Sequence, residues 1–223
     1  MSQEKGMVYT FHVPAPCKDE VKVVYADDEI VLVDKPAGLL SVPGRILKDS
    51  VFQRLLYEYP DLSVVHRLDL DTSGLMIFAN SKFAVSKLNQ QFRERSISKT
   101  YEALVFGRVD EHAGRIDLPI GPDPDKRPLR RVDFERGKDS LTLFERIEVG
   151  EERSRLRLEP ITGRSHQLRI HLMAIGHPIL GCDLYAHPLA FSASERLCLH
   201  ATGLILEHPG SEKKVEFHSE VPF

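Results

Sequence analysis

Apolar residues follow one another, or alternate with polar residues, in several short runs along the chain, and these runs predict strands. Residues 21–38, VKVVYADDEIVLVDKPAG, hold two such runs around three acidic residues and end at a Pro and a Gly, which is typical of a hairpin. The run LMIFAN, residues 75–80, is apolar up to its last position and predicts a buried strand. Further strand-like runs cover residues 99–107, 154–160, 196–209 and 213–218.

Apolar residues three or four positions apart predict three helices. Asp49 or Ser50 can cap the first helix, which Pro60 stops. Ser81 is the predicted N-cap of the second helix, and Gly176 ends the third. The predicted helices cover residues 48–60, 81–95 and 165–176.

The order of these elements indicates the fold class. Strands outnumber helices and do not alternate with them, so the prediction is α+β, with a mixed, mainly antiparallel central sheet and flanking helices and loops. Residues 1–20, which include Pro14 and Pro16, are expected to form an N-terminal tail, and residues 21–223 one domain. The sequence has neither a Gly-x-Gly-x-x-Gly fingerprint nor a Gly-Lys-Ser/Thr phosphate loop, which argues against a dinucleotide-binding fold.

Composition narrows the cellular setting. Three scattered cysteines among 223 residues form no disulfide framework and no metal-binding pattern, as expected in a reducing compartment. No apolar stretch approaches the length of a membrane span, and the first residues lack the apolar core of a secretory signal. We therefore expect a cytoplasmic protein with no membrane association.

The overall charge gives no support to nucleic-acid binding, because the net charge is −3. The local charge differs, since one segment is strongly basic. On composition alone this segment is most simply a solvated surface. Its basic residues are Lys126, Arg127, Arg130, Arg131, Arg136 and Lys138.

The stretch HRLDLDTSGL, residues 66–75, carries the first candidate chemistry, and a calcium loop is one interpretation. Asp69, Asp71, Ser73 and Gly74 match positions one, three, five and six of the calcium-loop pattern. Position twelve needs a bidentate Glu, and Asn80 stands there. A buried strand is also predicted where the loop should be followed by a helix, so the calcium interpretation is weak.

An aspartyl nucleophile for phosphoryl transfer is a second interpretation of the same stretch. An Asp-x-Asp pair after a buried strand can hold Mg²⁺ while one carboxylate attacks. Here His66 and Arg67 interrupt the strand that should precede the pair. A neighbouring guanidinium would also compete with the metal for the carboxylates, which disfavours this chemistry.

A third interpretation pairs one Asp with a basic group elsewhere. PITGRSHQLRIH, residues 160–171, gathers Arg164, His166, Gln167 and Arg169 at the start of a predicted helix, where backbone N–H groups favour anions. A guanidinium can bind a carboxylate in a bidentate way and keep it ionised and oriented, as a nucleophile must be. An ordinary structural salt bridge explains the residues equally well at this point.

Taken together, five stretches resemble the RluA-type pseudouridine synthases. HRLDLDTSG is similar to that family's catalytic motif, KTYEALV to its Tyr motif and PITGRSHQLRIH to its third motif. DKPAGLLSVPG and GHPILGCDLYA are similar to the segments before and after these motifs. The matches run in the family's order over about nine-tenths of the chain. The subgroup that acts on both tRNA and 23S rRNA is the most similar, and we expect no S4 domain because the lead-in before the first strand is short.

The resemblance implies an isomerase that converts uridine to pseudouridine without a metal or a cofactor. It implies Asp69 as the nucleophile, through C1′, C6 or a glycal route, paired with Arg169. Tyr101 would lie against the flipped base and act as the base for the C5 proton, although it could be a core aromatic residue. Arg67 would fill the space that the extruded uridine leaves in the RNA stack.

The resemblance also changes the interpretation of the basic residues. The substrate would be a stem-loop of tRNA, 23S rRNA or both, bound without a membrane or an obligate protein partner by a monomeric enzyme. Thr72, Ser73 and Gly74 are expected to form a turn that holds Asp69, and Asp71 is expected to be exposed. The sequence departs from the family's pattern at two places. It has KRPLRRV where relatives have a Lys-rich segment, and Cys182 where an Asp is commoner. The expected RNA contacts are Arg67, His66, Arg164, Gln167, Lys126, Arg127, Arg130 and Arg131.

Overall fold

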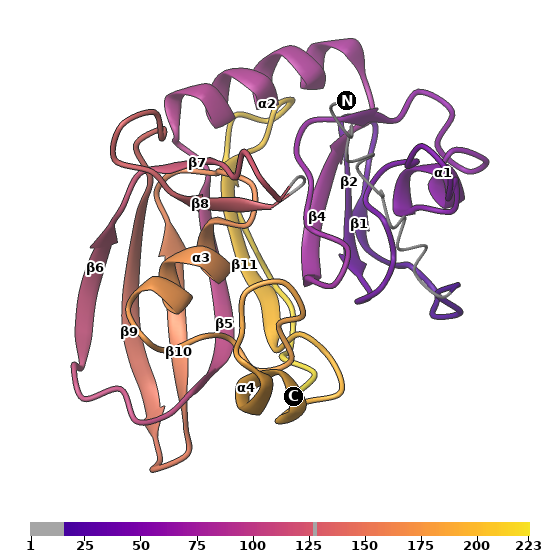
Figure 1. Ribbon diagram of the computed structural model, residues 1–223. Coiled ribbons are helices and arrows are strands. Elements are labelled where there is room, and N and C mark those ends of the chain that lie inside the picture. Colours follow the sequence, from indigo (N-terminus) through magenta and orange to yellow (C-terminus); the bar gives the residue numbers. More distant parts are fainter. Residues whose placement is uncertain (1–15, 127–128) are drawn as a thin grey trace, which may run out of the picture.

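A computed structural model describes residues 16–126 and 129–223, and this part of the chain contains four helices and twelve strands (Figure 1). The helices are α1 (Val51–Leu55), α2 (Lys82–Glu94), α3 (Gln167–Ala174) and α4 (Pro188–Ser192). The first six strands are β1 (Lys22–Ala26), β2 (Ile30–Lys35), β3 (Ser63–Val64), β4 (Ser73–Ala79), β5 (Ser98–Phe106) and β6 (Ala113–Asp117). The others are β7 (Ile120–Pro122), β8 (Arg130–Val132), β9 (Leu141–Val149), β10 (Arg153–Pro160), β11 (Leu199–Glu207) and β12 (Lys214–His218).

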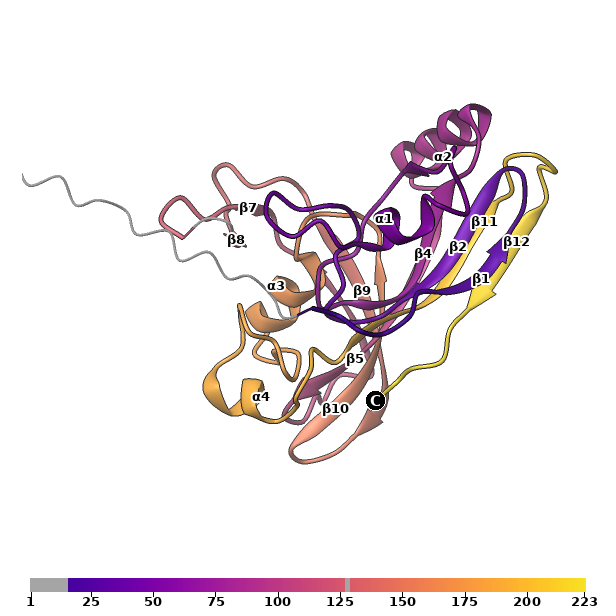
Figure 2. The same ribbon diagram turned by 90° about the vertical axis from the view of Figure 1, so that its right-hand side faces the viewer.

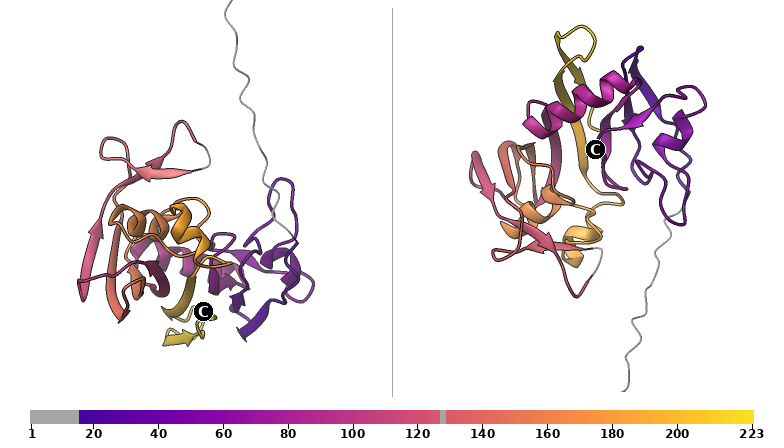
Figure 3. Two further views of the ribbon diagram at one scale, coloured as in Figure 1. Left: turned by 60° about the horizontal axis from the view of Figure 1, so that its bottom comes forward. Right: turned by 90° about the horizontal axis from the view of Figure 1, so that it is seen from above.

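Ten of the strands form one sheet in the order β1-β2-β4-β11-β5-β10-β9-β6, with β3 beside β4 and β12 beside β11. All pairs in this sheet are antiparallel except β4 and β11. The predicted α+β class and mixed, mainly antiparallel sheet are therefore confirmed. β7 and β8 form a separate hairpin that stands away from the sheet on the side of α3 (Figures 2 and 3).

The strands β4 and β11 join the two halves of the sheet through only two residue pairs, Ser73 with His200 and Gly74 with Ala201. A side chain at Gly74 would collide with the backbone of Ala201, and its φ of +107° also favours glycine. Ser73 and Gly74 therefore belong to a strand, and the expected turn over residues 72–74 is wrong at these two positions.

The continuous apolar run in β4 arises because both faces of the strand are covered. Ile30, Leu32, Leu75 and Ile77 pack with Ala84 and Leu88 of α2. The alternate residues Val31, Val33, Met76 and Phe78 pack with Val51 and Leu55 of α1. A strand buried on both faces has no polar side to alternate with, which explains why LMIFA reads as a single hydrophobic block.

Most predicted elements are confirmed, together with two caps. The side chains of Ser50 and Ser81 accept hydrogen bonds from Gln53 and Ala84 N–H at the starts of α1 and α2. The first helix is shorter than predicted, because it ends at Leu55 rather than at Pro60. The basic segment 126–138 also contains a strand, β8, and is not a single loop.

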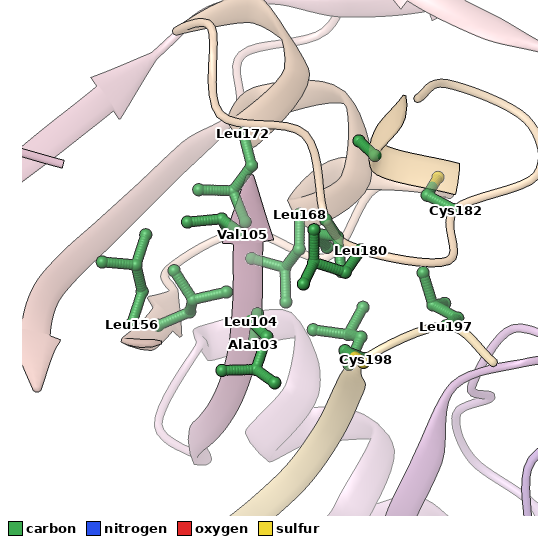
Figure 4. Close-up of a cluster of buried hydrophobic side chains, with 14 of the residues drawn as sticks. Ala103, Leu104, Val105, Leu156, Leu168, Leu172, Leu180, Cys182, Leu197 and Cys198 are labelled. Atoms are coloured by element: carbon green, nitrogen blue, oxygen red, sulfur yellow. The ribbon is translucent and has the colours of Figure 1, made fainter. Parts of the chain in front are cut away.

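A second hydrophobic cluster attaches α3 to the sheet (Figure 4). Leu168 and Leu172 of α3 pack with Ala103 and Val105 of β5 and with Leu156 of β10. The buried side chains fix the helix, so the residues at its N-terminal end have a defined position relative to β5.

Within residues 16–126 and 129–223, no helix has the length and apolar character needed to span a membrane.

Candidate active site

A cleft of about 540 Å³ lies between the 65–72 loop, the C-terminal end of α2, the start of β5 and residues 160–169. These segments are far apart in the sequence, and they bring together all three motifs described above. Seven of the predicted site residues line the cleft, namely His66, Arg67, Asp69, Tyr101, Arg164, Gln167 and Arg169.

The loop that carries Asp69 is held on both sides of this residue. The Ser41 hydroxyl donates to the Leu68 carbonyl at 2.6 Å and accepts from the Leu68 N–H at 3.1 Å. On the other side, the Leu70 carbonyl accepts from Gly38 N–H at 3.0 Å and from Lys35 Nζ at 2.8 Å. The segment 35–41 therefore fixes the backbone at Asp69, whose side chain is left at the cleft.

Lys35 supports the loop of the site, and the sequence interpretation missed it. Its side chain is fully buried, and its ammonium also donates to the carbonyls of Pro36 and Leu39. Burial lowers the pKa of Lys35 to about 7, against the opposing effect of the nearby Asp71. A lysine at the end of the apolar run IVLVD was the available signal, because a charged residue there needs buried partners.

Arg169 lies at the cleft but does not form the predicted ion pair with Asp69. Its guanidinium donates to Asp183 Oδ1 at 2.5 Å and to Cys182 Sγ at 3.3 Å. The basic group that lies within salt-bridge distance of Asp69 is His166, whose Nε2 is 3.9 Å from Asp69 Oδ1. Arg169 bonds to the turn after α3 because this turn supplies nearer acceptors than the loop after β3.

Tyr101 projects from β5 toward the cleft. Within the described residues its hydroxyl makes no hydrogen bond, although the ring packs against two of the buried clusters. Burial, with a further contribution from Asp69, raises the pKa of Tyr101 above that of an ordinary phenol. The hydroxyl is thus neutral and free to bond a substrate in the cleft.

Asp71 is not exposed, contrary to expectation. The side chain is partly buried, and burial followed by repulsion from Asp183 raises its pKa, while Arg169 and Lys35 oppose this rise. The charges of Lys35, Asp71, Arg169 and Asp183 therefore act on one another. No group of three or more His, Cys, Asp or Glu side chains suited to a metal ion occurs within residues 16–126 and 129–223.

Two of the predicted RNA contacts, Gln167 and His66, have hydrogen-bond partners within the protein. Gln167 is 4% exposed, and its amide bonds Thr162 and Arg164 through oxygen and Leu141 and Thr142 through nitrogen. No polar group of Gln167 is left for RNA, so this prediction is wrong.

His66 accepts a hydrogen bond from Ile77 N–H through Nε2 at 3.0 Å and stacks near Phe92. Burial lowers the pKa of His66 to about 3, with a smaller effect of Lys99, so the ring is neutral. Its main role is to connect the Asp69 loop to β4, and only Nδ1 remains for another partner.

The remaining basic residues lie nearer to solvent. Arg67 is exposed at the cleft, and Arg164 donates to the Asp139 carbonyl at 3.2 Å. Arg130 and Arg131 begin β8, close to the exposed Lys126. Arg127 lies outside the described residues.

A buried chain of hydrogen bonds supports the junction between β4 and β11. Arg196 donates to Ser73 Oγ at 2.6 Å, and Ser73 Oγ lies 2.8 Å from His200 Nδ1. His200 Nε2 lies 2.9 Å from Ser219 Oγ, which donates to Asp34. Because Ser219 uses its proton on Asp34, His200 must donate from Nε2 and accept at Nδ1, as a neutral ring does.

This chain predicts acid sensitivity. Burial lowers the pKa of His200 to about 4 from 6.5, against the effect of Asp34. Between these values the unfolded state binds a proton that the folded state does not, so the free energy of unfolding should fall as the pH falls through this window. In His200→Asn, chemical denaturation should show a shallower dependence on pH. His112→Asn, at an exposed position, should retain the wild-type slope, and an unchanged slope in His200→Asn would contradict the assignment.

The comparisons with known proteins first define the class. The fold is similar to the solved structure titled Human RNA Pseudouridylate Synthase Domain Containing 1, with a TM-score of 0.80 and 28% identity, over 95% of this chain and 87% of that one. A second human structure, RNA Pseudouridylate Synthase Domain Containing 4, has a TM-score of 0.72 and 25% identity over 90% and 88% of the two chains. The architecture is therefore that of pseudouridylate synthases.

The family follows from the sequence. Residues 29–174 match the model described as RNA pseudouridylate synthase, and the chain belongs to this family of RNA-modifying isomerases. It is 52% identical to the dual-specificity RNA pseudouridine synthase RluA of Vibrio parahaemolyticus, over 85% of this chain and 78% of the relative. It is 45% identical to the protein of the same name from Escherichia coli K12, over 90% and 93% of the two chains. The predicted family is confirmed.

Proposed function

We propose that this enzyme isomerises specific uridines in structured stem-loops of tRNA and 23S rRNA. The similarity to relatives named as dual-specificity synthases, at 45–52% identity over most of the chain, supports two classes of RNA substrate. Enzymes that act on a base must take it out of the stack, and the cleft beside Asp69 is the receiving pocket in this proposal.

Asp69 is the proposed nucleophile, and the observation that carries this role is the fixed loop around it. Hydrogen bonds from the side chains of Ser41 and Lys35 hold the backbone before and after Asp69, so that the carboxylate is presented to the cleft with little freedom. In the reaction the C1′–N1 bond of uridine breaks, the uracil rotates, C1′ bonds C5, C5 loses its proton and N1 gains one. Tyr101 is proposed as the base for that proton, and Arg169 as the cation that balances the local carboxylates.

RNA is proposed to bind between the cleft and the hairpin of β7 and β8. Arg67, His66 and Arg164 lie at the cleft, and Lys126, Arg130 and Arg131 lie on the hairpin, which stands clear of the sheet (left view of Figure 3). Arg127 belongs to the same basic segment. Phosphate contacts from both sides would position a stem-loop over the pocket.

Residues 21–223 would act as the catalytic domain, in the cytoplasm, as a monomer and without a metal or a cofactor. Isomerisation needs no added group, because the product contains the same atoms as the substrate.

The proposal is tested by tritium release from tRNA and from 23S rRNA fragments labelled with [5-³H]uridine, in the presence of EDTA. Release from both RNAs is the expected result. Phosphate release that EDTA abolishes would instead indicate a Mg²⁺-dependent phosphatase, and tight RNA binding without tritium release an RNA-binding module. Either of these results would overturn the proposal.

Arg67 is expected to take the place of the extruded base. The variant Arg67→Ala should lose more activity on a loop closed by a stable stem than on a flexible loop, because only the closed loop has a stack to refill. The measurement is the ratio of kcat/KM for two RNAs that differ in stem stability. Equal losses on both RNAs would count against this role.

Arg131 is expected to contact phosphate. The variant Arg131→Gln should weaken binding of different RNAs to a similar extent and reduce the slope of log K against log salt by about 1. Titration of RNA at several salt concentrations provides this slope. The variant Arg115→Gln, at an exposed position on β6, should leave it unchanged.

A further inference from the structure

Three segments are connected in a line that ends at Asp69. Arg130 N–H, in the hairpin of β7 and β8, donates to Tyr185 Oη at 3.2 Å. Tyr185 Oη lies 2.5 Å from His166 Nδ1, and His166 Nε2 lies 3.9 Å from Asp69 Oδ1. Tyr185 belongs to the turn after α3, and His166 is the residue before α3. The line therefore runs from the basic hairpin through two side chains to the proposed nucleophile.

One arrangement of the protons along this line gives every group a partner within the described residues. Tyr185 Oη accepts from a backbone N–H, and its own proton has no acceptor among the described residues other than His166 Nδ1. If Nδ1 accepts, the proton of a neutral imidazole must be on Nε2, the atom that faces Asp69. His166 thus offers Asp69 an N–H donor without adding a full positive charge.

The backbone at His166 is consistent with a functional constraint. This residue has a φ of +59°, in the left-handed region that side-chain-bearing residues seldom adopt. Although it occupies the N-cap position of α3, its side chain does not cap the helix and is instead bonded to Tyr185. The ring is half-buried against Tyr185 in an edge-to-face contact, which limits its rotation. The unusual backbone is therefore associated with the placement of the imidazole between Tyr185 and Asp69.

We propose that His166 and Tyr185 are positioning residues that connect the seating of RNA on the β7–β8 hairpin with the orientation of Asp69. This inference rests on the proposed function. When RNA fixes the hairpin, Arg130 N–H fixes Tyr185, Tyr185 fixes the imidazole, and Nε2–H closes the 3.9 Å gap to a hydrogen bond with Asp69. Contacts of this kind are commonly long in the free enzyme and shorten in the substrate complex.

The test begins with Tyr185→Phe, which removes the hydroxyl and keeps the ring that lies 5.4 Å from the Arg169 guanidinium. In tritium release from labelled tRNA, kcat should fall about tenfold, while KM and the affinity for RNA stay within about twofold. His166→Asn should also lose kcat, since Asn tolerates the left-handed backbone but lacks the imidazole. Tyr57→Phe, at a fully exposed position, is the matched control and should match the wild type.

A variant with both substitutions tests whether Tyr185 acts on Asp69 through His166. If Tyr185 acts through His166, the kcat of Tyr185→Phe with His166→Asn should equal that of His166→Asn alone. Additive losses would overturn the inference, as would a wild-type kcat in Tyr185→Phe or a change confined to KM. Absence of tritium release from the wild type would overturn the proposed function and this inference with it, whereas release from the wild type with unaltered variants would overturn the inference alone.

Discussion

Replacement of Asp69 by Asn is expected to reduce tritium release by at least about 10⁴-fold, the scale of loss when a nucleophile is removed. The amide has nearly the same shape as the carboxylate, so the loop held by Ser41 and Lys35 should stay in place. What the amide lacks is the negative charge needed to attack the sugar or base, or to take the 2′ proton. Asp69→Ala should give the same loss, while the affinity for RNA stays within about threefold for both variants.

Two further carboxylates provide the controls for Asp69. Asp61→Asn, at an exposed position outside the cleft, should retain wild-type release. Asp71→Asn tests the paired-carboxylate interpretation directly, and we expect a loss below about tenfold because Asp71 is not among the residues that line the cleft. A loss in Asp71→Asn as large as that in Asp69→Asn would contradict the assignment of a single nucleophile.

The sequence predicted which residues line the cleft better than it predicted their hydrogen-bond partners. The ordered motifs were sufficient to predict that Asp69, Tyr101 and Arg169 share one site, because the motifs of an enzyme family usually form its catalytic site. The three residues do line the same cleft. The partner of Arg169 could not be predicted, since Asp183 and Cys182 come within reach only through the turn after α3. Tertiary distances decide which acceptor a guanidinium takes, and a sequence does not contain them.

Residues that look alike in a motif also differ in what they do. Gln167 and His166 are neighbours in the same polar stretch, yet Gln167 is fully bonded within the protein and His166 faces Asp69. Their difference comes from the direction in which each side chain leaves the first turn of α3. Lys35 was missed for a related reason, because a lysine before a Pro resembles an exposed strand end until its three carbonyl partners are known.

A strand was predicted from the sequence where all of its residues, or every second residue, are apolar. Strands without such a pattern were missed. β4 and β11 are buried along nearly their whole length, and their runs were visible in the sequence. β6 is the edge strand of the sheet and β9 is its neighbour, and several side chains of both strands are charged and exposed. Such strands form through backbone pairing with their neighbours, so the hydrophobic pattern alone does not reveal them.

Tyr101→Phe is expected to keep RNA binding within about twofold and to lower kcat by about 10²- to 10⁴-fold. The ring remains packed between two buried clusters, so the shape of the cleft should not change. The missing group is a hydroxyl that makes no bond within the described residues and is therefore available to the flipped base. As a base, the neutral phenol must pass its own proton to an acceptor while it takes the proton from C5, and the proposed acceptor is the Asp69 carboxylate, which is near enough to raise the pKa of Tyr101.

The pH dependence of this variant distinguishes a catalytic hydroxyl from a packing residue. Burial and then Asp69 raise the pKa of Tyr101, so its hydroxyl keeps its proton from about pH 6 to about pH 9, and the loss in Tyr101→Phe should be equal across this range. Tyr57→Phe is the control for removal of a phenol outside the cleft. If Tyr101→Phe retained full tritium release, the role of Tyr101 as the base would be excluded. The proton from C5 would then have to pass directly to another group in the cleft, and the Asp69 carboxylate is the first group to test.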